Sequence, residues 1–166
     1  MYKKIINYLS IYKRKLKYRK NSYSFNGVDL IINYLFKGKK NGFYLDVGAQ
    51  HPVSNNNTYL LFKRGWKGIN IDLDKKNIDL FQTVRPGDIN LNVALSDSKK
   101  EANLYFYHDS SPINTLSEKV SNFQKTKVQK IKKIKTKELN IVLEELNLKN
   151  HIDYMNLDVE GYENKV

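Results

Sequence analysis

The chain has 166 residues, 40% of them hydrophobic, which is enough for one globular domain with a buried core. It contains no cysteine, which excludes disulfides and thiolate metal sites and fits a reducing compartment. No segment approaches the ~20 apolar residues of a membrane span, and the first residues lack the apolar stretch of a secretory signal. We therefore expect a cytoplasmic protein.

The formal net charge of +12 is concentrated in two segments of the chain. Residues 1–40 contain eleven Lys or Arg and one acid, and residues 119–137 contain eight Lys and no acid. The remainder is therefore acidic overall. A protein that binds duplex DNA spreads its basic surface over the folded body, so we expect no specific nucleic-acid partner.

Residues 1–40 are predicted to form a basic helical arm, followed by one domain over residues 41–166. Between Met1 and Lys20, Ile5, Leu9, Tyr12 and Leu16 recur at helical spacing among lysines. We expect this amphipathic helix to pack on its own domain, and weak contact with an anionic membrane surface is the alternative.

Helices and strands alternate along the domain. We expect helices over residues 29–37 and 77–84, a helix opened by capping side chains at residues 55–58, and a helix capped by Thr136. Strands are expected over residues 43–47, 68–72, 89–95, 102–107 and 151–159, and residues 119–137 are expected to be an exposed loop with some helix. This alternation predicts an α/β fold, a Rossmann-like parallel sheet with right-handed crossovers.

Polar residues gather where four of the expected strands end. The pairs are Asp46 with Gly48, Asp72 with Asp74, Asn92 with Asp97, and Asp158 with Glu160. Open α/β sheets bind ligands beyond the carboxyl ends of their strands. Asp72 lies 24 residues after Gly48, near the ~20-residue offset at which an acid binds a ribose hydroxyl. We therefore expect a ligand that contains a nucleoside.

The turn after the first expected strand discriminates between nucleoside cofactors. A dinucleotide pyrophosphate needs a Gly-x-Gly-x-x-Gly turn, whereas this turn keeps only Gly48 and contains Pro52, which has no amide to donate. Asp46 would also repel phosphate. A sulfonium and an ammonium group would be attracted to this edge, so S-adenosylmethionine fits better than NAD.

These residues resemble the FkbM family of S-adenosylmethionine-dependent methyltransferases over roughly residues 42–163. The matching motifs are FYLDVGA at 43–49, HP at 51–52, NT at 57–58, RGWKGINID at 64–72, NVALSD at 92–97 and IDYMNLDVEG at 152–161. The resemblance implies methyl transfer to a hydroxyl of a glycan or another small-molecule acceptor.

The resemblance also implies roles for individual residues. Asp46, Gly48 and Ala49 would line the methionine side of the cofactor, Asp72 would bind the ribose, and Asn92 and Asp97 would lie on the adenine side. Asp158 would face the transferred methyl group with Glu160 beside it. The base that takes the acceptor's proton is one of Asp158, Glu160 and His51, or a divalent cation on Asp158 lowers the pKa of the acceptor hydroxyl instead.

The family pattern continues past Val166 with further strands. We therefore expect a C-terminally truncated sheet whose last strand offers an unpaired edge for self-association, and a 166-residue chain that turns over no acceptor. Two other functions stay open. One is a basic module that binds nucleic acid or anionic lipid without catalysis, and the other is a nicotinamide oxidoreductase.

Overall fold

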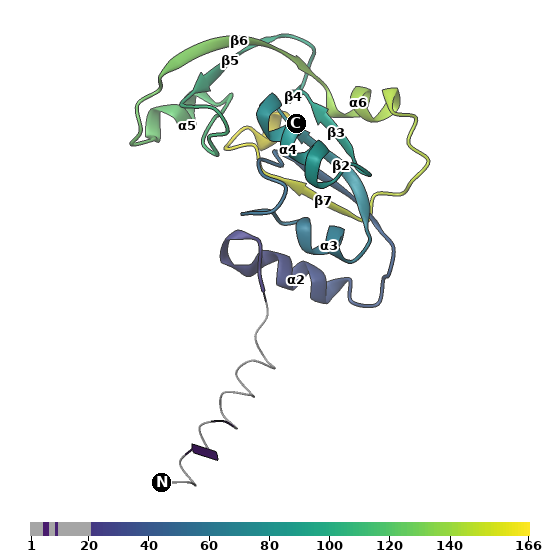
Figure 1. Ribbon diagram of the computed structural model, residues 1–166. Coiled ribbons are helices and arrows are strands. Elements are labelled where there is room, and N and C mark those ends of the chain that lie inside the picture. Colours follow the sequence, from purple (N-terminus) through teal and green to yellow (C-terminus); the bar gives the residue numbers. More distant parts are fainter. Residues whose placement is uncertain (1–4, 7–8, 10–20) are drawn as a thin grey trace.

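The computed structural model describes residues 5–6, 9 and 21–166 (Figure 1). The predicted arm helix falls mainly outside these residues. The apolar residues of the arm that are described, Ile5, Ile6 and Leu9, are each about half exposed. Within the described part of the chain, no helix is long and apolar enough to cross a membrane.

The main sheet has four parallel strands in the order β3-β2-β1-β7. They are β1 (Phe43–Val47), β2 (Lys67–Asp72), β3 (Ile89–Asn92) and β7 (Tyr154–Leu157). Asp46 lies opposite both Asn70 and Asn156, so the carboxyl ends of the strands form one edge. The predicted parallel α/β sheet is confirmed. Among the described residues, β7 has β1 as its one neighbour.

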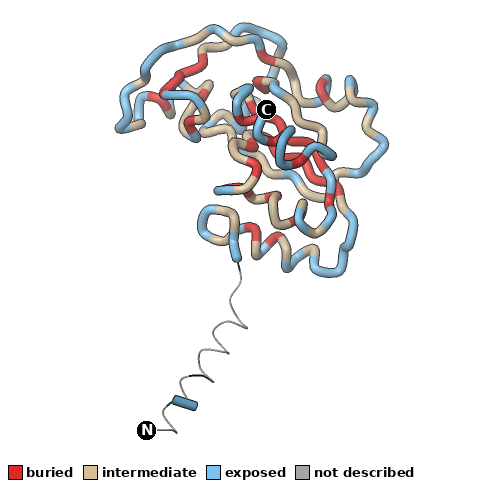
Figure 2. Tube along the Cα trace, viewed as in Figure 1, coloured by how far each residue is buried: buried red, intermediate tan, exposed pale blue. Residues whose placement is uncertain are grey.

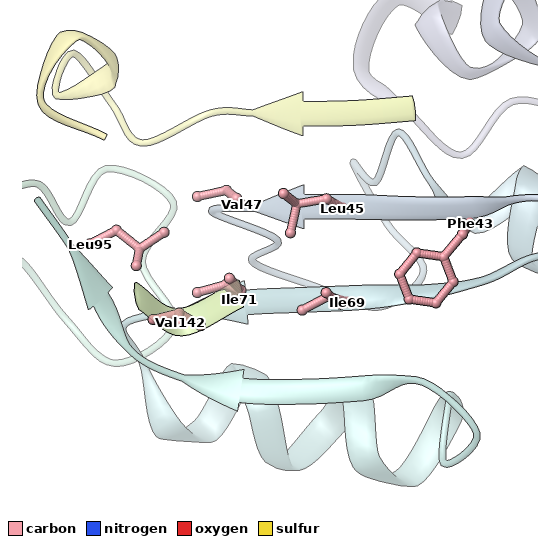
Figure 3. Close-up of a cluster of buried hydrophobic side chains, with 7 residues drawn as sticks. All are labelled: Phe43, Leu45, Val47, Ile69, Ile71, Leu95 and Val142. Atoms are coloured by element: carbon pink, nitrogen blue, oxygen red, sulfur yellow. The ribbon is translucent and has the colours of Figure 1, made fainter. Parts of the chain in front are cut away.

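The strands of the main sheet are largely buried (Figure 2), and different helices cover its two faces. On one face, alternate residues of β1 and β2 form an apolar cluster with Leu95 and with Val142 of α6 (Leu139–Glu145) (Figure 3). On the other face, Tyr44 packs with Trp66 and with residues of α2 (Val28–Leu35) and α3 (Tyr59–Lys63). The short helix η1 (Phe25–Gly27) precedes α2, and α4 (Lys75–Val84) packs against β2 and β3.

A second, three-stranded sheet has the order β4-β6-β5. Its strands are β4 (Ala94–Leu95), β5 (Glu101–Phe106) and β6 (Lys130–Lys137), with β5 and β6 antiparallel. The helix α5 (Glu118–Phe123) lies between β5 and β6 in the chain, and η2 (Glu163–Lys165) follows β7. In Figure 1 the β5–β6 hairpin extends away from the main sheet.

This second sheet corrects three of the predictions. The single strand over residues 89–95 is wrong, because the chain leaves the main sheet at Val93 and Ala94 pairs with Thr136 instead. The loop over residues 119–137 is α5 followed by β6. Thr136 does not cap a helix, since its hydroxyl donates to the carbonyl of Ser98 (2.9 Å) and Glu138 takes the N-cap position of α6.

Candidate active site

A two-part cavity lies at the carboxyl ends of the main-sheet strands. The part that we call the apolar chamber contains about 620 Å³ of space free of protein atoms, a volume that includes open solvent. Its walls include Val47 and Ile71 at the ends of β1 and β2, next to Leu95 (Figure 3). Its other wall residues are Gly48, Gln50, Asp72, Leu73, Asp74, Asn77, Val93, Ala94, Ser111, Pro112, Asn114, Leu116, Asp158, Val159, Glu160 and Tyr162.

The second part, which we call the polar chamber, shares Gly48, Gln50, Pro112, Asp158 and Glu160 with the first. Its remaining walls are Phe25, Asp46, Ala49, Asn55, Asn56, Asn57 and Asn156. Carboxylates and amides therefore dominate this chamber. The sheet brings six of the nine predicted site residues to the cavity, namely Asp46, Gly48, Ala49, Asp72, Asp158 and Glu160.

Gly48 makes the tight turn that joins the two chambers. Its φ of 75° lies in the left-handed region, and its N–H and that of Ala49 both donate to the carbonyl of Ile71 (2.9 and 3.1 Å). A Cβ atom at this position would lie 1.8 Å from the carbonyl oxygen of Asp158. Only glycine allows the turn to pass this close to the end of β7.

Asp72 is a buried carboxylate at the end of β2. One oxygen accepts from the Gln50 N–H (2.8 Å), and the other accepts from the Asp74 N–H (2.7 Å) and the Asn77 amide (3.1 Å). Burial raises the pKa of this carboxyl. An ionised carboxylate has about four acceptor positions, so three bonds leave one for a ligand.

Two wall residues of the apolar chamber carry buried polar atoms without a protein partner. They are Oδ1 of Asn77 and Oγ of Ser111, on side chains 3% and 5% exposed. Buried polar groups are hydrogen-bonded as a rule, so these two atoms fit a polar ligand in the chamber. Neither Asn77 nor Ser111 was predicted as a site residue, because neither belongs to a motif. Asn77 was expected only to begin a helix.

Asp46 is anchored on both oxygens within the polar chamber. Its Oδ2 accepts from the Thr58 hydroxyl (2.7 Å) and the Asn56 amide (3.1 Å), and its Oδ1 accepts from the Asn156 amide (2.9 Å). Thr58 makes no side-chain capping bond to α3. Of the residues predicted to cap this helix, Asn56 accepts through Oδ1 from the Thr58 N–H at its start (3.0 Å). Asn56 and Thr58, which precede α3, therefore orient the Asp46 carboxylate of β1.

Arg85 is fully buried behind this network. Its guanidinium donates to the carbonyl of Pro52, to Oδ1 of Asn56 (2.7 Å) and to the hydroxyl of Thr58 (2.8 Å). Four aromatic rings surround it, those of Tyr44, Tyr59, Phe62 and Phe81. Arg85 therefore holds two of the three side chains that bind Asp46. The sequence predictions gave Arg85 no role in the site.

Asp158 and Glu160 lie where the two chambers meet and remain partly open to solvent. Desolvation raises the pKa of both carboxyls, and the negative charge of Glu163 raises both further. The negative charge of Asp46 raises the pKa of Asp158 further, and the negative charge of Asp158 raises the pKa of Glu160. Two carboxyls held near a third form a site that favours either a proton or a cationic group.

This cluster predicts a specific dependence of stability on pH. Because the folded state raises these pKa values, Asp158 and Glu160 favour folding at low pH and oppose it as pH rises through the shifted pKa values. The Asp158→Asn/Glu160→Gln variant should gain stability over the wild type as pH rises from 4 to 8 in urea unfolding. Asp109→Asn should show almost no trend over this range, since Lys76 lowers the pKa of Asp109 below its ordinary value and its contribution to stability changes only below about pH 4. A pH-independent difference for the double variant would contradict the prediction.

Three predicted site residues lie outside the cavity walls. Nδ1 of His51 accepts from the N–H groups of Val53 and Ser54, so this ring braces its own loop, and burial lowers its pKa. The Asn92 amide donates to the carbonyl of Asp72 (3.0 Å). Asp97 is exposed and forms ion pairs with Lys100 and Lys165, with Nζ–O distances of 2.5 and 2.8 Å.

The predicted divalent cation on Asp158 has little support from the surrounding side chains. In the described residues, no group of three or more His, Asp or Glu side chains is arranged to hold a metal ion. Asp158 and Glu160 therefore remain candidates for proton transfer and for attraction of a cation.

Comparison with family models shows to which protein family the chain belongs. The model of the methyltransferase FkbM domain matches residues 46–166, which include β1 from Asp46 onward and every cavity residue except Phe25. Searches of curated proteins and of solved structures returned no significant match. The family match covers well over half of the chain, and the predicted resemblance is confirmed: the chain belongs to the FkbM methyltransferase family.

Proposed function

We propose that this chain uses S-adenosylmethionine to methylate a hydroxyl group of a glycan or another small-molecule acceptor. When bound, the cofactor supplies a methyl group activated by a sulfonium centre. The apolar chamber suits its adenosine part, because apolar walls alternate there with the free acceptor position of Asp72 and the unpartnered atoms of Asn77 and Ser111. The carboxylates near Gly48 suit its positive charges.

The polar chamber is proposed to receive the acceptor. Asn55, Asn57 and Asn156 supply amide groups that can bind several hydroxyls, as a glycan requires. Asp158 or Glu160 is proposed to take the proton from the reacting hydroxyl. Their raised pKa values suit a base that works nearer to neutral pH than an ordinary carboxylate.

The observation that carries the proposal is the state of Asp72. It is a buried acid at the end of β2, in the wall of a cavity, with one acceptor position free beside the unpartnered oxygen of Asn77. A carboxylate in this place binds the ribose hydroxyls of nucleoside cofactors in α/β sheets.

Asp72→Asn should weaken S-adenosylmethionine binding by about 10- to 100-fold, because a hydrogen bond to a charged group contributes about 1.5–3 kcal/mol. Calorimetric titration of the purified, folded variant measures this. Asp88→Asn is the matched control, because Asp88 is also a carboxyl whose pKa burial raises, but it lies outside both chambers. Equal affinities for the Asp72 variant and the wild type would refute the proposed ribose site.

A further inference from the structure

The outward face of α2 is apolar. Around the helix, at 100° per residue, the exposed residues occupy one arc of about 120°. They are Val28, Ile31, Tyr34 and Leu35, with exposed fractions of 40%, 61%, 65% and 72%. Ile32 and Asp29, which lie about 40° and 100° beyond Val28 around the helix, are buried against the domain. A surface helix ordinarily turns its apolar side inward, so a wide apolar arc on the outside indicates a binding surface.

This surface continues to the mouth of the cavity. Phe25, in η1 just before α2, is 72% exposed and also lines the polar chamber. We call Phe25 together with the four exposed residues of α2 the α2 outer face. It therefore runs from the entrance of the polar chamber along the whole helix.

The α2 outer face adjoins a basic segment. Lys37, Lys39 and Lys40 follow the helix directly, and Lys39 forms an ion pair with Asp153 of the domain (2.5 Å). The one acid of residues 21–40, Asp29, does not offset the charge of these lysines at the surface. It is 1% exposed, and its carboxylate accepts hydrogen bonds from Ser22, Ser24 and the Tyr23 N–H.

Neither the described residues of the arm nor a second copy of the chain covers this face. Ile5, Ile6 and Leu9 are each about half exposed, so their apolar surface is not buried against α2. Two copies joined through this face would bring the lysines that follow α2 in each copy together, at a cost from like-charge repulsion. The partner must combine an apolar layer with negative charge.

We propose that the α2 outer face binds the surface of an anionic lipid bilayer. Apolar side chains enter the boundary between headgroups and acyl chains, and lysines beside them bind the anionic headgroups. Lys37 already lies over the Tyr34 ring, with its Nζ 4.7 Å from the ring centroid. Binding in this orientation places the mouth of the polar chamber next to the lipid surface. The inference does not depend on the identity of the cofactor.

The test is sedimentation of the full chain with vesicles. One set contains phosphatidylcholine alone, and the other contains equal parts of phosphatidylcholine and phosphatidylglycerol. Binding should require the anionic vesicles, weaken as salt is added, and fall at least about 10-fold in Ile31→Ser/Leu35→Ser. Leu80→Ser is the matched control, since Leu80 is a 41% exposed residue of α4 outside this face, and it should bind as the wild type does.

Three results would overturn the proposal. They are no binding to anionic vesicles, equal binding to both vesicle types, and equal binding of the double variant and the wild type. If the wild type were a dimer in lipid-free buffer and the double variant a monomer, the face would instead bind a second copy of the chain. All replaced side chains are exposed, so circular dichroism should show the fold unchanged.

Discussion

Gly48→Ala should lower the free energy of unfolding by at least about 3 kcal/mol and abolish measurable binding of S-adenosylmethionine. The new Cβ would meet the Asp158 carbonyl oxygen at 1.8 Å, and the backbone φ of 75° is unfavourable for alanine. Relief of the clash must separate the turn after β1 from the end of β7. Both chambers would then change shape. Urea unfolding and calorimetric titration measure the two effects.

Gly65→Ala separates the clash from the backbone strain. Gly65 also has a positive φ, 92°, but a Cβ atom there would meet nothing within 4 Å. This variant should lose only about 1 kcal/mol of stability and keep its affinity for the cofactor. If Gly48→Ala behaved like Gly65→Ala in both measurements, the close approach of the turn to β7 would not matter for the site.

Arg85→Met should cost roughly 3–5 kcal/mol of stability, because it leaves the Pro52 carbonyl without its buried donors and removes the hydrogen bonds from Arg85 to Asn56 and Thr58. It should also weaken cofactor binding in the molecules that remain folded, since Asn56 and Thr58 orient Asp46. Arg85→Lys keeps the charge but loses the fork of donors, so we expect an intermediate result. Binding is measured at a temperature where unfolding curves show each variant to be folded.

Arg64→Met is the control for a purely structural effect. Arg64 also donates several hydrogen bonds, to Asn33 and to the carbonyls of Phe36 and Lys39, but these lie at the end of α2 away from the cavity. It should lower stability and leave cofactor affinity within about twofold of the wild type. If Arg64→Met and Arg85→Met lost affinity for the cofactor to the same extent, the prediction that Arg85 positions Asp46 for cofactor binding would be wrong.

The sequence predicted the main sheet and much of its ligand-binding edge because both depend on local patterns. Apolar runs that end in an acid identified β1, β2 and β7, and the parallel arrangement brought Asp46, Asp72 and Asp158 to one edge. Each of these residues lies within one position of the end of a strand, so its position along the chain indicates its position in space.

In the second sheet, the alternating pattern at residues 102–107 predicted β5, but not its pairing with β6. Val128, Ile131 and Ile134 recur every three residues, which favours a helix, but residues 130–135 pair with β5 and residues 136–137 pair with β4. The ammonium groups of Lys130 and Lys132 lie over the ring of Phe106, 4.9 and 3.4 Å from its centroid, so charged side chains cover an apolar ring there. Such pairing depends on contacts between distant segments, and local spacing carries no information about it.

Arg85 and Asn77 were missed for a related reason. An arginine before Pro-Gly is typical of an exposed turn, and only the approach of α3 and α4 encloses Arg85 between aromatic rings. Asn77 resembles any polar residue of a helix until α4 packs against β2 and directs its amide to Asp72. Conversely, Asn92 and Asp97 follow a strand end as expected, but the chain turns there and neither lines the cavity.

The central claim is that the cavity at the end of the sheet binds S-adenosylmethionine. Calorimetric titration of the folded wild-type chain with this cofactor, and separately with NAD, tests it most directly. We expect saturable binding of one S-adenosylmethionine per chain and no measurable binding of NAD. No heat with S-adenosylmethionine, from protein shown to be folded by circular dichroism, would contradict the account, as would tighter binding of NAD.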